Sequence, residues 1–109
     1  MAFDEDLAER IRFYIDPIKE NFTEKKMFGG LCFLYQGKMS VGLIKNQLVG
    51  RVVGEKYQNA LEMDHCSEMD FTGRKMKNFV YVNQAGCETE EQLAFWIELG
   101  IEHAKLALK

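Results

Sequence analysis

Hydrophobic residues recur every three or four positions at the two ends of the chain and at every second position between them. The first pattern predicts an amphipathic helix whose apolar face carries Phe3, Leu7, Ile11, Ile15 and Ile18. Asp4 precedes this face and is a suitable N-cap. Pro17 is expected to end or kink the helix near Ile15, and Asp16-Pro17 can also open one further turn.

A period of two follows and predicts an antiparallel meander of three strands. In the first strand, one face carries Leu31, Phe33 and Tyr35. The other face carries Cys32 and Leu34. Successive side chains of a strand point to opposite sides, so this alternation places one set in a core.

The second strand repeats the alternation. Its two faces carry Met39, Val41 and Leu43 on one side and Ser40, Gly42 and Ile44 on the other. Gly37-Lys38 predicts a type II′ hairpin turn before this strand, and Asn46-Gln47 predicts the turn after it. The third strand is expected over residues 48–53, and residues 23–28 can add a short strand ahead of the meander.

Two adjacent glycines, Gly29 and Gly30, stand between apolar residues with no polar loop around them. Glycine adopts backbone angles that other residues resist, and it lets another backbone or a ligand come close. No Lys-Ser or Lys-Thr pair follows, as it would in a Walker loop, and no helix pattern follows, as it would in a dinucleotide fingerprint. We therefore interpret the pair as a bend or bulge between strands, and a binding pocket there as the alternative.

The second half of the chain predicts two helices and one or two strands. A short helix is expected over residues 55–63, an irregular segment over 64–67, a weak strand over 68–71, a polar basic loop over 72–78 and a strand over 79–82. Thr89 and Gln92 form the spacing of a capping box at the start of the last helix. The apolar stripe of that helix comprises Leu93, Trp96, Ile97, Ile101, Ala104 and Leu108, and Gly100 on the same stripe lets the helix approach the sheet closely.

This order of elements predicts an α+β fold of two layers. N-terminal, middle and C-terminal helices pack on an antiparallel sheet, which consists of a β-meander plus later strands. A length of 109 residues suits one domain over residues 1–109. The net charge of −3 argues against a general affinity for nucleic acid or for anionic membranes. Three cysteines without regular spacing and an acidic N-terminus indicate a cytoplasmic protein without a disulfide framework, signal peptide or membrane span.

Catalytic and metal-binding chemistry have one weak candidate segment, Asp64-His65-Cys66. A cysteine nucleophile is normally oriented by groups distant in sequence, so the adjacency of His65 and Cys66 does not make a catalytic pair. Structural zinc sites supply four ligands at regular spacing, and here Cys87 or His103 would have to complete the shell. We expect no catalytic residue, no metal and no cofactor, and therefore not an enzyme.

Nucleic-acid binding has a second candidate segment. Arg74, Lys75 and Lys77 lie close in sequence to Phe79 and Tyr81, which places basic and aromatic residues together. The chain is acidic and contains no helix-turn-helix or RNA-recognition signature. We interpret the segment as a solvated loop, with weak nucleic-acid binding as the alternative.

The chain resembles the N-terminal domain of the TfoX (Sxy) family of competence regulators. The family's [RK]-x-M-F-G-G motif stands here as Lys25, Lys26, Met27, Phe28, Gly29 and Gly30. Its strand of the L-x-x-[KR] kind is matched by Leu48 and Arg51. A late aromatic strand, residues 79–82, and a last helix with Phe95 and Trp96 near its start also fit.

The resemblance implies an α+β fold without catalysis or a known cofactor. Full-length competence regulators carry a second, helical domain and act in transcription beside the cyclic-AMP receptor protein, whereas this sequence matches the N-terminal domain alone. We therefore expect a stand-alone regulatory or interaction module that binds a protein partner or itself as a homodimer. A small-ligand or cysteine-dependent protein with a pocket near Gly29-Gly30 is the alternative.

Overall fold

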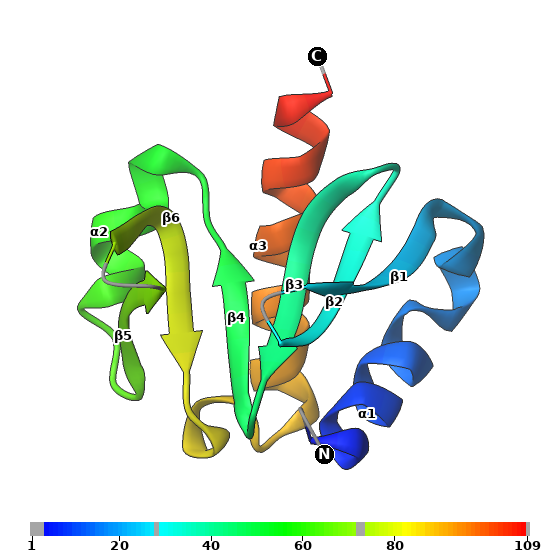
Figure 1. Cartoon of the computed structure of the whole chain (residues 1–109), viewed down its shortest axis with the longest axis horizontal. Helices are drawn as coiled ribbons and strands as arrows, with labels where there is room; N and C mark the ends of the chain where they lie inside the picture. The colour runs from blue at the N-terminus through cyan, green and yellow to red at the C-terminus, as the bar shows by residue number, and fades with distance from the viewer. Residues whose placement is uncertain (1–3, 28, 72–73, 109) are drawn as a thin grey trace.

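The computed structural model describes the backbone of residues 4–27, 29–71 and 74–108, and the side chains of these residues except 27, 69–71 and 74–77. Helices and strands follow one another in the order expected for an α+β fold (Figure 1). The elements are α1 (Glu5–Ile15), η1 (Asp16–Asn21), β1 (Phe22–Met27), β2 (Gly30–Tyr35), β3 (Lys38–Ile44), β4 (Gln47–Arg51), α2 (Gly54–Leu61), β5 (Cys66–Phe71), β6 (Arg74–Val82), η2 (Gln84–Cys87) and α3 (Glu90–Ala107).

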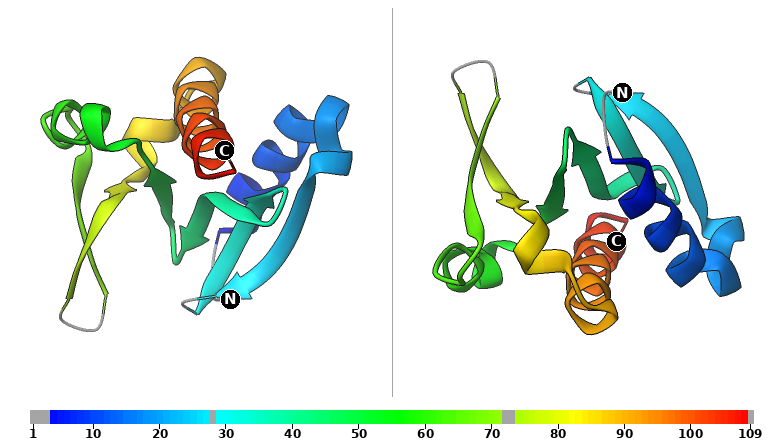
Figure 2. Two further views of the ribbon diagram at one scale, coloured as in Figure 1. Left: turned by 90° about the horizontal axis from the view of Figure 1, so that it is seen from above. Right: turned by 90° about the horizontal axis from the view of Figure 1, so that it is seen from below.

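The six strands form one antiparallel sheet in the order β1-β2-β3-β4-β6-β5. Both views of Figure 2 place α1 and α3 on the same side of β3 and β4. The ion pair between Lys56 of α2 and Glu102 of α3, with 2.8 Å between Nζ and Oε1, links α2 to this helical layer. The predicted fold class, an antiparallel sheet with helices packed on it, is confirmed.

The N-terminal helix begins and ends where its sequence predicts. The Oδ1 atom of Asp4 accepts hydrogen bonds from the backbone nitrogens of Asp6 (3.0 Å) and Leu7 (3.2 Å). The α-helix ends at Ile15, and Pro17 lies in the first turn of the 3₁₀-helix η1. Asp16 is the first residue of η1 and does not cap it, so the further turn exists without the expected cap.

The main core lies between the sheet and the helices. Leu31, Phe33 and Tyr35 of β2 face it, together with the buried face of α1. Five of the six residues in the predicted stripe of α3 are buried there. Leu108 is the exception: it is 42% exposed, because α3 ends at Ala107 and Leu108 lies beyond the core.

Both meander turns lie one residue earlier than predicted. Tyr35 pairs with Lys38, so Gln36 and Gly37 form the first turn, and both have positive φ (49° and 87°) as in a type I′ hairpin. Ile44 pairs with Gln47, so the second turn is the pair at positions 45 and 46. The sequence indicates a turn in each region, through Gly37 in the first and Asn46 in the second, without fixing the register, which depends on the cross-strand pairs.

A β-bulge at Ser40 reverses the face predicted for Met39. Phe33 pairs with Val41 and Leu34 pairs with Met39, so Ser40 is the extra residue. One extra residue shifts the alternation of side chains, so residues before the bulge face the side of the sheet opposite to the one predicted. Met39 therefore packs with Cys32 and Val49 on the sheet face away from α3, while Val41 stays in the main core.

The prediction of a basic loop over residues 72–78 is wrong for the part that the structure describes. β6 begins at Arg74, which pairs with Phe71, and Lys75 pairs with Asp70. β5 begins at Cys66, two residues earlier than the expected weak strand. Polar residues do not prevent strand formation at the end of a sheet, since one face of an antiparallel pair can meet water.

Gly29 and Gly30 connect β1 to β2. Gly29 has a φ of 75°, and a Cβ added there would meet no atom within 4 Å. Gly30 begins β2, and a Cβ there would clash with the backbone carbonyl of Leu43. Gly29 therefore makes the turn, and Gly30 allows β2 to approach β3 closely. Both agree with the interpretation of the pair as a bend between strands. Of the family motif, Phe28 and the side chain of Met27 lie outside the described residues, and Lys26 is an exposed residue of β1.

Candidate functional site

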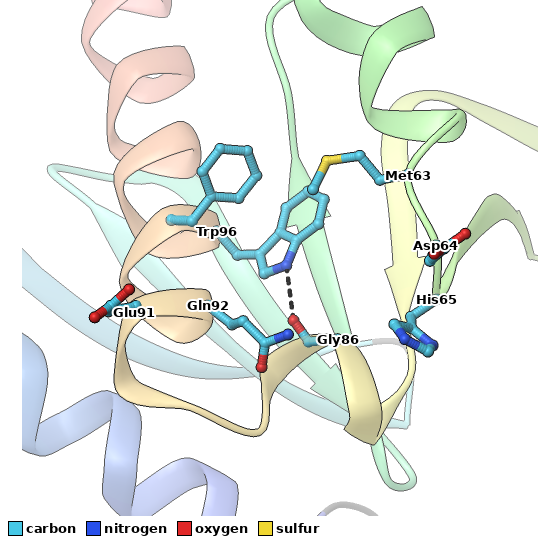
Figure 3. A pocket seen from close by; sticks show the side chains of 8 residues that line it. Met63, Asp64, His65, Gly86, Glu91, Gln92 and Trp96 are labelled. Carbon is cyan, nitrogen blue, oxygen red and sulfur yellow. Dashed lines mark hydrogen bonds between the residues drawn. The ribbon is translucent and has the colours of Figure 1, made fainter.

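A hollow of about 250 Å³ lies between the loop after α2, η2 and the first turns of α3 (Figure 3). Segments that are far apart in the sequence contribute its walls. The lining residues are Met63, Asp64, His65, Gly86, Glu91, Gln92, Phe95 and Trp96. Apolar atoms supply most of the wall, and two carboxylates lie among the lining residues.

Trp96 is the buried aromatic residue of this hollow. Its side chain is 2% exposed, and its Nε1 atom donates a hydrogen bond of 3.2 Å to the backbone oxygen of Gly86. The rings of Phe95 and Trp96 meet edge to face with 5.0 Å between centroids. The hydrogen bond satisfies the only polar group of the indole, so the ring is held in one orientation.

Gly86 allows the wall opposite Trp96 to form. A Cβ at this position would lie 2.6 Å from Cγ1 of Val82 and 3.0 Å from Cβ of His65. Only glycine lets η2 pass this close to both neighbours. The carbonyl that Gly86 presents to Trp96 therefore depends on the absence of its side chain.

The capping box of α3 also shapes the hollow. Oγ1 of Thr89 accepts from the backbone nitrogen of Gln92 (3.1 Å), while Oε1 of Gln92 accepts from the backbone nitrogens of Thr89 and Glu88 (both 3.0 Å). Nε2 of Gln92 donates to the backbone oxygen of Ala85 (3.2 Å). The predicted capping box is confirmed, and its glutamine fastens η2 to the helix that carries Trp96.

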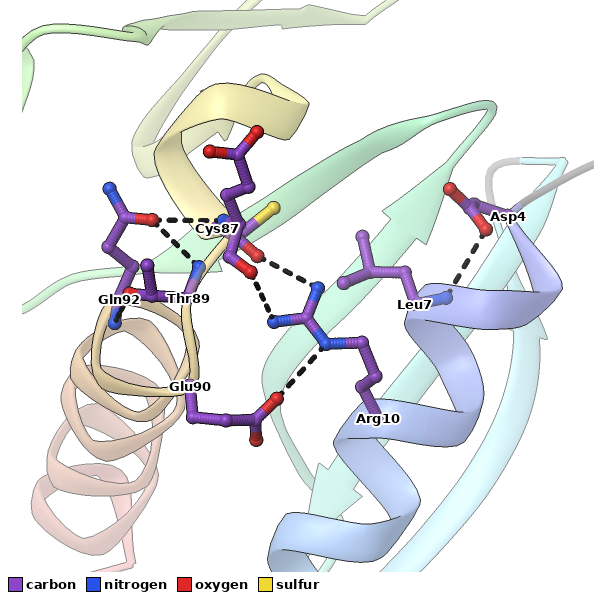
Figure 4. Close-up of polar contacts among 8 residues, drawn as sticks. Asp4, Leu7, Arg10, Cys87, Thr89, Glu90 and Gln92 are labelled. Carbon is purple, nitrogen blue, oxygen red and sulfur yellow. Dashed lines mark hydrogen bonds and ion pairs between the residues drawn. The ribbon is translucent and has the colours of Figure 1, made fainter.

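Arg10 joins this region to α1 (Figure 4). Its guanidinium donates to the backbone oxygens of Cys87 (3.1 Å) and Glu88 (3.0 Å), and its Nε donates to Oε1 of Glu90 (3.3 Å). The planar group thus binds three acceptors at the start of α3, two in the segment before it and one on its first residue. The sequence shows Arg10 only as one charge on the polar face of a helix, so no local pattern predicts this contact.

Two apolar side chains on the rim of the hollow remain open to solvent. Met63 is 42% exposed and Phe95 is 43% exposed. The carboxylates of Asp64 and Glu91 belong to exposed residues beside them. The rim therefore combines apolar surface with negative charge.

His65 and Cys66, adjacent in sequence, lie in different surroundings. His65 lines the hollow, has a φ of 72° and accepts a backbone hydrogen bond of 3.0 Å from Asn83. Cys66 begins β5 opposite Val82 and packs against the main core. Burial raises the pKa of the Cys66 thiol to about 11, so it is protonated at neutral pH and a weak nucleophile.

The remaining metal candidates of the sequence show no shared site. Cys87 is buried, and its Sγ lies 3.5 Å from the backbone oxygen of Asn83. His103 lies on α3, where burial and the positive charge of Arg51 lower its pKa. Among the described residues, no group of three or more histidine, cysteine or acidic side chains is placed to hold a metal ion.

The residues that sequence reasoning singled out are thus largely apart from the hollow. Arg74, Lys75 and Lys77 belong to β6, and their side chains lie outside the described residues. The sequence does not predict that Phe95 and Met63 lie at one site, because Phe95 is off the apolar stripe of α3 and Met63 lies beyond the end of α2. The part of the chain that the structure describes contains no helix long and apolar enough to cross a membrane.

Comparison with known proteins identifies one family. The family model described as TfoX N-terminal domain matches residues 14–104, which include every strand, α2, η2 and most of α3. No curated protein and no solved structure matches the chain.

Proposed function

Because the chain belongs to the TfoX N-terminal domain family, we propose that it is a regulatory interaction module that binds a protein partner, without catalysis, through the hollow beside Trp96. The observation that carries this proposal is the pair of apolar side chains, Met63 and Phe95, exposed on either side of the hollow. Covering them removes apolar surface from water, which stabilises a complex by about 25 cal/mol for each Å². The family's link to competence and transcription makes regulation the natural setting.

The size of the hollow favours one side chain of a partner over a whole small molecule. Pockets for drug-sized ligands usually enclose about 300–1,000 Å³. The hollow of about 250 Å³ lies below that range. A single apolar anchor at the centre of a larger contact is the common arrangement of protein interfaces.

The charge of the rim selects the partner's chemistry. Asp64 and Glu91 are carboxylates, and none of the described residues that line the hollow is a lysine or arginine. A lysine or arginine beside the anchor can pair with these carboxylates or lie over the ring of Phe95. The proposed partner therefore presents an apolar side chain next to a basic one.

A random-peptide display library provides a direct test. The library is selected on the immobilised full chain and then counter-selected on the Phe95→Glu variant, which adds charge at an exposed position. Peptides recovered by this procedure are expected to share an apolar residue beside lysine or arginine. The matched control is Phe13→Glu on α1, because Phe13 is 80% exposed and is not among the residues lining the hollow.

The same selection distinguishes the other readings. Peptides that bind wild type and Phe95→Glu equally would contradict the hollow as the binding surface. If sedimentation shows that the wild type is a dimer and the Phe95→Glu variant a monomer, the partner that binds the hollow is a second copy of the chain and not a different protein. A cysteine-dependent function receives no support from Cys66, because burial raises the pKa of its thiol to about 11.

A further inference from the structure

Arg51 is a cation on the sheet face that α1 and α3 leave uncovered. It is the last residue of β4 and shares a face with Val49, which packs with Cys32 and Met39 in the second apolar cluster. Across the strand pair it meets Phe79 of β6, and its Cζ lies 5.0 Å from the centre of the Phe79 ring. In Figure 1, β3 passes in front of α3, and β4 and β6 continue the sheet to its left.

The guanidinium of Arg51 has no counter-ion among the described residues. Its Nε atom is buried without a hydrogen-bond partner there. By contrast, Arg10 and Arg12 each pair with a glutamate. Burial lowers the pKa of Arg51, and no described carboxylate offsets this. A desolvated arginine stacked on an aromatic ring is a common setting for a bound anion, since its planar fork matches a carboxylate.

The surroundings of Arg51 favour an anion that carries a single charge and an apolar body. Four partly buried apolar or aromatic residues pack beside the second cluster: Leu34, Ile44, Phe79 and Tyr81. Arg51 acts electrostatically on His103 of α3. Because burial and Arg51 both lower the pKa of His103, it does not supply a second positive charge at neutral pH. A phosphate dianion usually recruits more than one cation or a helix N-terminus.

We propose that Arg51 and Phe79 bind the carboxylate of a small apolar acid, whose hydrocarbon or aromatic body lies along the sheet face opposite α3. This site is separate from the hollow beside Trp96, which is built on the helical side. Phe79 lies against the guanidinium, and the partly buried residues beside the second cluster, Leu34 and Tyr81 among them, contact the body of the acid. The charge supplies specificity for the acid over a neutral analogue of the same shape.

The side-chain Nε–H signal of Arg51 in a ¹⁵N-labelled full chain reports on this site directly. The probes are 4-phenylbutyrate and its neutral analogue 4-phenylbutanol. We expect a saturable shift of the Arg51 signal with the acid, and at least about tenfold weaker binding of the alcohol. This comparison uses the wild-type chain and does not depend on the folding of a variant.

Two substitutions sharpen the test. Arg51→Met keeps much of the side chain's apolar contact but removes the charge, so it should abolish the preference for the acid. Arg12→Met is the matched control, because Arg12 is already paired with Glu24 and should leave binding of the acid unchanged. Equal binding of acid and alcohol, or no saturable shift at about 10 mM acid, would overturn the proposal. An equally strong response to inorganic phosphate would overturn the choice of ligand class. Each of these results leaves the peptide test of the hollow unaffected.

Discussion

Gly100 of α3 lies directly against the backbone of Ser40 in β3. A Cβ on Gly100 would clash with the carbonyl oxygen of Ser40 and would lie 2.6 Å from its carbonyl carbon. Ser40 is itself the bulged residue, and its Oγ donates to the backbone oxygen of Phe33 (3.1 Å). The close approach of α3 to the sheet that Gly100 predicts is therefore present. It occurs at the bulge of β3.

Gly100→Ala should destabilise the fold. Alanine in a helix interior normally stabilises by about 0.5–1 kcal/mol relative to glycine. Here the new methyl group meets backbone, which cannot move aside as a side chain can, so we expect a net loss of about 2 kcal/mol. Urea unfolding measures the change. Gly54→Ala is the control, since a Cβ there lies 4.0 Å from its nearest contact, and an equal loss in both variants would contradict the account.

Thr89→Ala should cost about 1 kcal/mol of stability, because it removes the hydroxyl that accepts from the backbone nitrogen of Gln92. Thr89→Ser retains this acceptor and should restore most of the loss. Thermal unfolding of the three proteins provides the measurement. A loss that serine fails to recover would show that the threonine methyl group, and not the cap, is responsible.

The ion pair between Arg12 and Glu24 should make stability depend on pH. Two hydrogen bonds of 2.8 Å from Arg12 lower the pKa of Glu24 below its ordinary value of 4.5. The ionised form is favoured in the folded state, so this contribution is present above pH 4.5 and disappears as pH falls through the lowered pKa. Both side chains are more than a third exposed, so the contribution is only about 0.5–1 kcal/mol.

Glu24→Gln tests this contribution by urea unfolding between pH 7 and pH 3. The variant should be less stable than wild type at pH 7, and the difference should vanish toward pH 3. Glu20→Gln, at an exposed position in η1, is the matched control and should follow wild type throughout. A difference between Glu24→Gln and wild type that stays constant across this range would exclude the ion pair as its cause.

Cys66 should react slowly with iodoacetamide at neutral pH. With a pKa of about 11, the thiolate fraction at pH 7 is on the order of 1 in 10,000. Mass spectrometry of the native chain should show alkylation at least about tenfold slower than that of a free thiol such as glutathione. Unfolded protein in urea is the control and should react at all three cysteines. Rapid and selective labelling of native Cys66 would revive a cysteine-dependent function.

Local patterns predicted the elements well where one face of each was consistently apolar. The alternation in residues 31–35 and the capping box at Thr89 and Gln92 needed no information from distant residues, and both agree with the structure. The side of the sheet on which Met39 lies could not be predicted from the local pattern. Both Met39 and Val41 are apolar, and only the pairing with β2 shows that Ser40 is bulged.

The candidate sites depended still more on tertiary structure. The hollow joins the loop after α2 to η2 and α3, and none of these segments carries a binding motif on its own. Arg51 could be recognised as a strand residue, but only the structure shows that it lies against Phe79 and that no counter-ion for it is found among the described residues. Sequence reasoning selected His65 for its reactivity, whereas the structure places it in a wall that is mainly apolar.

The emission of Trp96 offers the most direct test of the proposed partner surface, because this is the chain's only tryptophan and it lines the hollow. A selected peptide with an apolar residue beside lysine is titrated into wild type, Phe13→Glu and Phe95→Glu. We predict a saturable change in Trp96 emission for wild type and Phe13→Glu, and no change for Phe95→Glu. A peptide that binds wild type while leaving Trp96 emission unchanged, or that changes it equally in Phe95→Glu, would contradict binding in the hollow.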